Sequence, residues 1–183
     1  MTVMNYFYRC TASTIKRLLF AVFIYSIPIS LYSEALTEYQ IKAAFLYNFT
    51  TFTEWPNKQN TQLNLCTFHT NPFGKYLYEL QNQKAGAKTI SVYHITDLEE
   101  LDKCQAVFIS RTATKRLPEI LDKLHNRPVL TISDSPSTIQ QGVILNMITL
   151  QNKVTFEANL AAARRNDLML SSKLLRLATE VIQ

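Results

Sequence analysis

The chain has 183 residues, a formal net charge of +5 and only three glycines. This length fits one ordinary domain with a sizeable core. The positive charge is too mild and too evenly spread to indicate a nucleic-acid-binding protein, and Gly74, Gly86 and Gly142 cannot form a Rossmann or Walker phosphate loop.

The first 35 residues have the pattern of a secretory signal peptide. Basic residues precede an apolar run at 18–29, and a small-x-small site follows it. We expect cleavage after Ala35, with a cut after Ser33 as the close alternative. An uncleaved anchor is a second interpretation, but the run is shorter than the roughly 20 residues that span a bilayer. Both interpretations place residues 36–183 outside the cytoplasm.

A helix is predicted to begin at Thr37 or Glu38 and to end at Trp55-Pro56. Its apolar stripe has period 3.6 and contains one polar residue, Asn48, which either bonds to a neighbouring strand or contacts a ligand. Trp55 either packs in the core or takes part in ligand recognition. The stripe consists of Ile41, Ala44, Phe45, Asn48, Phe49 and Phe52.

Short strands then alternate with helices. The strands are predicted at 62–68, 89–95, 106–109 and 128–132, and the helical segments after Asn71-Pro72, at 97–101 and at 114–124. Such alternation is typical of a parallel sheet covered by helices.

The pattern changes after the loop at 133–136. Strands at 143–150 and 153–157 flank Gln151-Asn152, which is suited to a two-residue hairpin turn. A helix is predicted at 159–165. A last helix, capped by Ser171 or Ser172, is predicted to bury Leu174, Leu177, Ala178 and Val181. The sequence therefore predicts a single α/β domain over residues 36–183, with a mixed, mostly parallel sheet of about six strands, helices on both faces and a late antiparallel hairpin.

Two cysteines remain after signal removal, Cys66 and Cys104. In an oxidising compartment we expect them to form one disulfide, and two buried free thiols are the alternative. The absence of a C-x-x-C pattern gives no support to thiol-redox catalysis.

Residues with catalytic or metal-binding chemistry do not gather in the sequence. The three histidines have no metal-ligand spacing, and no serine has the context of a nucleophile elbow. Asp134 follows a predicted strand, where α/β folds bind ligands, but an Asp in a Ser/Pro turn typically makes a local hydrogen bond. We therefore expect no enzyme activity, metal or cofactor. Arg164 either binds an anion or is a surface residue.

Several segments in order resemble the YfiR-like family of exported regulatory proteins. They are 38–49 continuing to Glu54-Trp-Pro56, Leu65-Cys66 with Asn71-Pro-Phe-Gly74, 104–110, 129–134, 154–165 and 170–178. The resemblance covers essentially all of the mature domain.

The resemblance implies a periplasmic, non-enzymatic regulator. The best-known family member restrains a membrane-bound diguanylate cyclase by contacting its periplasmic portion, which lowers cyclic di-GMP and disfavours biofilm. The resemblance also implies a homodimer and redox sensitivity through a disulfide at Cys66 and Cys104. A second cysteine pair of that member is absent here, since no cysteine follows Gln105.

Two functions are therefore considered. A signalling inhibitor would bind its membrane partner through the late hairpin and the following helix, for which we name Leu145, Met147, Glu157 and Arg164. A periplasmic small-molecule sensor would use a pocket, for which we name Trp55 and Asn48. In either case, reduction of the disulfide would loosen the loops that Cys66 and Cys104 join.

Overall fold

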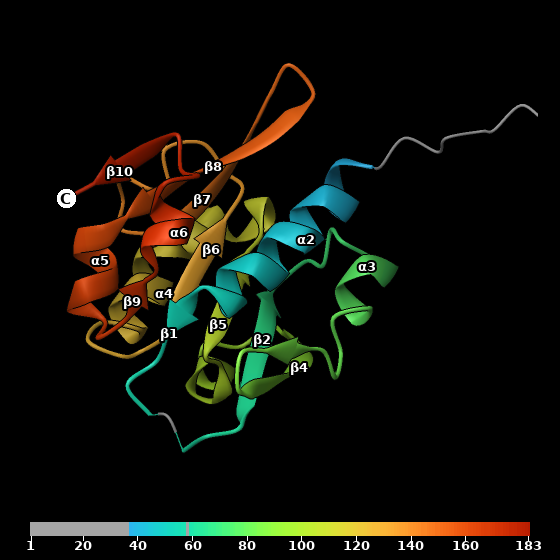
Figure 1. The fold of residues 1–183 in the computed structure, drawn as a ribbon, viewed down its shortest axis with the longest axis vertical. Helices are drawn as coiled ribbons and strands as arrows, with labels where there is room; N and C mark the ends of the chain where they lie inside the picture. The colour runs from blue at the N-terminus through green and yellow to red at the C-terminus, as the bar shows by residue number, and fades with distance from the viewer. Residues whose placement is uncertain (1–36, 58) are drawn as a thin grey trace, which may run out of the picture. The chain divides into compact units, whose positions relative to one another are not determined.

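A mixed eight-stranded sheet forms the centre of the computed structural model, which describes residues 37–57 and 59–183 (Figure 1). The predicted signal peptide, residues 1–35, lies outside the described residues. In chain order the strands are β2 (Gln62–Phe68), β3 (Lys84–Ala85), β4 (Lys88–Ile95), β5 (Ala106–Ile109), β6 (Leu130–Ser133), β7 (Leu145–Leu150), β8 (Lys153–Asn159) and β10 (Glu180–Ile182).

Their spatial order is β10-β8-β7-β6-β5-β2-β4-β3. Strands β4, β2, β5, β6 and β7 are mutually parallel, while β3 and β8 run antiparallel to β4 and β7. The predicted mixed, mostly parallel sheet is confirmed, but it has eight strands rather than about six. The additional short strands β3 and β10 extend its two edges.

Helical segments complete the domain. They are α2 (Glu38–Thr51), α3 (Lys75–Tyr78), α4 (Leu117–Lys123), α5 (Leu160–Arg165) and α6 (Ser172–Leu175), with the 3-10 turns η1 (Glu99–Lys103) and η2 (Arg111–Arg116). Successive strand residues point to opposite faces, so Phe108 of β5 joins one core cluster and Val107 the other. Helix α2 contributes Leu46 to the first cluster, and α4 contributes Ile120 to the second.

Helix α2 crosses one face of the sheet (Figure 1). It begins at Glu38, one of the two predicted starts, and Thr37 caps it by accepting a hydrogen bond from the amide of Gln40; the helix ends at Thr51, before Trp55. The predicted apolar stripe is rotated relative to the buried face, because Ala44 and Asn48 are exposed while Lys42 is buried. The prediction from hydrophobic periodicity counted apolar residues alone, so it did not place Lys42 on the buried face.

The predicted hairpin of β7 and β8 is present and extends past the other strands (Figure 1). Both turn residues, Gln151 and Asn152, have positive φ, as a two-residue hairpin turn requires. Met147 of β7 lies opposite Phe156 of β8, and Phe156 packs on Phe49 of α2. This face of the hairpin base is therefore core rather than surface.

The predicted last helix is mostly wrong. Ser171 caps α6 by accepting from the amide of Leu174, but α6 ends at Leu175 and the chain continues into β10, which pairs in parallel with β8. Leu177, predicted to be buried, is exposed. Two further short strands, β1 (Thr53–Glu54) and β9 (Met169–Leu170), pair antiparallel as a separate ribbon.

Candidate functional site

A cluster of three charged side chains, two of them buried, lies where β6 ends against α2. The Lys42 ammonium is 2.7 Å from Oδ2 of Asp134 and 2.6 Å from Oε1 of Glu38. The side chains of Lys42 and Asp134 are each only 2% exposed. The Tyr39 hydroxyl donates to Oδ2 of Asp134 at 3.3 Å. Thus Asp134 is satisfied by residues of α2, far away in the sequence.

The contacts within this cluster favour the charged forms of Lys42 and Glu38. Burial alone would lower the pKa of Lys42, but its hydrogen bonds to Asp134 and Glu38 outweigh this effect and raise that pKa above its usual value. The hydrogen bond from Lys42 lowers the pKa of Glu38. Burial, together with the Asp134 charge, raises the pKa of the Tyr39 hydroxyl.

The position of Asp134 is the one where parallel α/β sheets bind ligands, beyond the carboxyl ends of the strands. Here the side chain of Lys42 contacts that carboxylate. Neither the local turn hydrogen bond nor the ligand contact considered for Asp134 describes these contacts. The cluster fixes α2 to the sheet, and we assign it to stability rather than to chemistry.

The cysteines are bridged as expected. Cys66 and Cys104 form a disulfide with Cα atoms 6.0 Å apart. Cys66 lies inside β2, near its end, and Cys104 lies just before β5, so the bridge reinforces two strands that already pair. Both cysteines are buried in the second core cluster.

A second candidate place is a shallow pocket of about 390 Å³ beside the ribbon of β1 and β9. The pairing of Glu54 with Met169 in this ribbon brings the segment after α2 to the segment after α5. We call this place the Trp55 surface; it consists of Glu54, Trp55, Pro56, Arg164, Asp167, Leu168 and Met169.

The Trp55 surface has an apolar centre and a charged rim. Met169 is 62% exposed beside the largely buried indole of Trp55. Glu54, Arg164 and Asp167 are exposed, and none forms an ion pair within residues 37–57 and 59–183. An apolar centre with a polar rim is typical of protein interfaces.

This surface is connected to the disulfide through one backbone carbonyl. The indole Nε1 of Trp55 donates to the carbonyl oxygen of Gln105 at 3.1 Å, and Gln105 directly follows Cys104. A smaller pocket of about 200 Å³ has Trp55, Cys104 and Gln105 in its wall. The position of Trp55 is therefore tied to Gln105, whose backbone also bonds to Asn64 and Leu130.

The structure brings together two of the site residues named from the sequence, Trp55 and Arg164. Asn48 is exposed on α2 and is not part of that pocket. Leu145 and Met147 lie in the core, out of reach of a partner.

Glu157 is half-buried and accepts a hydrogen bond from the Asn146 amide at 3.1 Å. The four residues named for partner binding thus do not form one surface, and Arg164 is the one among them that is exposed.

Sequence reasoning missed Lys42 and Met169. Glu38 and Lys42 have the i,i+4 spacing of a helical ion pair, so their pairing could have been predicted from the sequence. The pairing of Lys42 with Asp134, 92 residues apart, has no local signal. Met169 lies in a two-residue strand, too short to give a periodic pattern.

In the part of the chain that the structure describes, no helix is long and apolar enough to cross a membrane. The same part contains no group of three or more His, Cys, Asp or Glu residues placed to hold a metal ion.

Two solved structures are similar to this chain at very low sequence identity. An ABC domain in complex with L-Trp from Streptococcus pneumonia has 9% identity and a TM-score of 0.54, over 79% of this chain and 60% of that one. A conserved domain protein from Vibrio cholerae O1 biovar El Tor has 9% identity and a TM-score of 0.49, with the same coverage. The chain thus spans about 60% of the length of these proteins, and the first likeness supports the α/β fold alone.

No curated protein matches the chain significantly. A family model described as YfiR/HmsC-like matches residues 39–179, which include Lys42 and Asp134, the disulfide and the Trp55 surface. The chain therefore belongs to the YfiR/HmsC-like family, a regulatory family associated with control of diguanylate cyclases.

Proposed function

We propose that this protein is exported to the periplasm, where it binds the periplasmic portion of a membrane-bound diguanylate cyclase and restrains it. Cyclic di-GMP output falls while the two proteins are bound and rises on release. Family membership supports the regulatory class. The signal-peptide pattern of residues 1–35 and the buried disulfide support the compartment.

The Trp55 surface is the observation that carries the proposed contact. Its exposed Met169 is held beside Trp55 by the β1–β9 ribbon, so the apolar centre is fixed before binding. Its rim offers the guanidinium of Arg164 and the carboxylates of Glu54 and Asp167 to groups of opposite charge on a partner. A fixed apolar centre reduces the entropy lost on association.

The experiment is recovery of the tagged domain from the periplasm of its native host, with identification of the proteins that accompany it. We expect a membrane protein with a periplasmic sensor portion and a cytoplasmic cyclase domain. Met169→Asp is expected to weaken this binding about 30-fold, the equivalent of about 2 kcal/mol for a central contact, and to raise cellular cyclic di-GMP.

Leu150→Asp is the matched control, because Leu150 is 61% exposed, close to the 62% of Met169, and lies at the tip of the β7–β8 hairpin. Equal loss of the cyclase in both variants would contradict the proposed surface. Recovery of untagged copies of this chain alone would contradict the cyclase contact, and would favour the homodimer and the small-molecule sensor.

Redox sensitivity is a separate part of the proposal. Reduction removes the covalent link at Cys104, directly before the Gln105 whose carbonyl accepts from Trp55, and so weakens the fixed surface. The Cys66→Ser/Cys104→Ser double variant is expected to bind the cyclase about tenfold more weakly than the parent, since about 1.4 kcal/mol corresponds to that factor. Equal affinities of the folded variant and the parent would show the disulfide to be structural only.

A further inference from the structure

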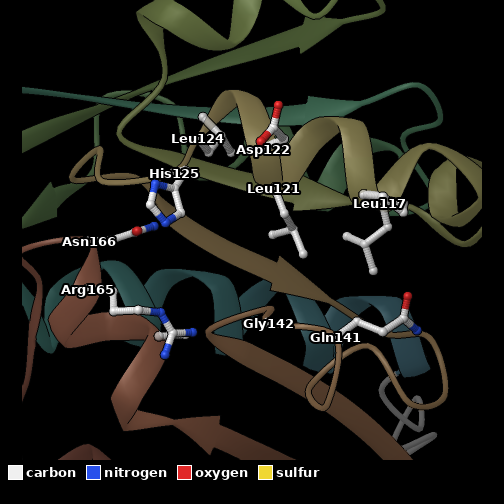
Figure 2. A pocket seen from close by; sticks show the side chains of 11 residues that line it. Leu117, Leu121, Asp122, Leu124, His125, Gln141, Gly142, Arg165 and Asn166 are labelled. Carbon is white, nitrogen blue, oxygen red and sulfur yellow. The ribbon is translucent and has the colours of Figure 1, made fainter.

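A third pocket, separate from the Trp55 surface, opens between α4, α5 and the loop before β7 (Figure 2). Its volume is about 480 Å³, within the range of about 300–1,000 Å³ that is typical of small-molecule sites.

One wall of this pocket is apolar. Leu117 and Leu124 are buried in the second core cluster, and Leu121 packs against that cluster while facing the opening (Figure 2). Gly142 lies opposite with φ of +112°, a conformation that favours glycine, and a Cβ there would stand 3.6 Å from Leu121. The absence of a side chain at this position leaves Leu121 accessible.

The other side of the pocket carries hydrogen-bond donors. Arg165, His125 and Asn166 come from the ends of α5 and α4, and their side chains gather on one side of the opening (Figure 2). Arg165 is exposed and forms no ion pair with any described residue. Asp122 also borders the pocket, but its carboxylate points away from Arg165 (Figure 2).

We propose that this pocket binds a small organic anion with an apolar body, such as a medium-chain carboxylate. The guanidinium of Arg165 can take both carboxylate oxygens, and His125 and Asn166 can donate to the same group. The apolar body lies along Pro118 and Leu121, which line the pocket and are not buried. The site does not require the cyclase, so its test and the test of the proposed function can fail independently.

The test is a titration of the purified domain with sodium octanoate. Binding is measured by calorimetry and by the NMR chemical shifts of the backbone amides of Gly142 and Ala162, both of which border the pocket. We expect saturable binding, weakened about tenfold by Arg165→Gln because one charge-assisted contact is lost. Arg164→Gln is the matched control, since Arg164 has the same charge on the same helix but lines the Trp55 surface instead. Its octanoate affinity is expected to match that of the parent.

Three results would overturn the proposal: no saturable octanoate binding, equal weakening by Arg164→Gln and Arg165→Gln, or equal affinity for octanoate and 1-octanol. The last result would show that the pocket binds the apolar chain without recognising the carboxylate charge. Both arginines are exposed, so both variants are expected to fold, and matching thermal unfolding curves verify this.

Discussion

Lys42→Met is expected to lower the free energy of unfolding by about 3–5 kcal/mol. Methionine retains most of the length and apolar stem of lysine, so the helix and its packing lose little. The loss arises because the Asp134 carboxylate, 2% exposed, remains buried without its cation. The Tyr39 hydroxyl is then its remaining side-chain partner in the described structure. Urea unfolding at neutral pH, followed by circular dichroism, measures the effect.

Two further variants separate this cause from a general effect of removing a lysine. Lys103→Met breaks the exposed pair with Glu100 and is expected to change the stability far less than Lys42→Met does, because solvent screens an exposed pair. The double variant Lys42→Met/Asp134→Leu removes both buried charges and is expected to recover most of the lost stability, because a hydrophobic pair can replace a buried ion pair. A double variant no more stable than Lys42→Met alone would contradict the account.

Loss of the disulfide is the second large effect. The bridge joins residues 38 apart, and the chain-entropy account gives about 4 kcal/mol for a loop of this size. We expect the Cys66→Ala/Cys104→Ala variant to unfold at a clearly lower urea concentration than the oxidised parent. The urea dependence of its unfolding free energy is expected to be steeper, because the unfolded chain without the bridge is more expanded.

The parent protein in the presence of a thiol reductant is the control, because it loses the bridge without changing the sequence. Its unfolding curve is expected to approach that of the variant once reduction is complete. An oxidised parent no more stable than the alanine variant would contradict a stabilising role, and would place the value of the bridge in signalling alone.

Local sequence patterns predicted much of the fold. The limits of β2 and β5 were predicted correctly, since strands of this kind carry their own apolar signal. The hairpin turn at Gln151-Asn152 and the cap at Ser171 were also predicted, because turn and cap chemistry is local.

The errors concern contacts between distant segments. Strand β10 has helical apolar spacing, but its conformation is decided by pairing with β8. Leu145 and Met147 belong to a strand whose apolar residues gave no sign of which face a helix would cover. Likewise, the surroundings of Trp55 and Arg164 depend on the β1–β9 ribbon, which joins segments more than a hundred residues apart. Their residue types identified Trp55 and Arg164 as candidates, but only the folded structure shows that they lie close together.

The position of Trp55 also has an optical consequence. It is the only tryptophan of the chain, its indole bonds to the residue after Cys104, and its ring borders the surface assigned to the partner. The tryptophan fluorescence of the protein therefore arises from one known place, and no signal from a second indole has to be subtracted. The protein thus contains its own reporter, through which changes in the bridge and occupation of the neighbouring surface can be followed without an attached dye.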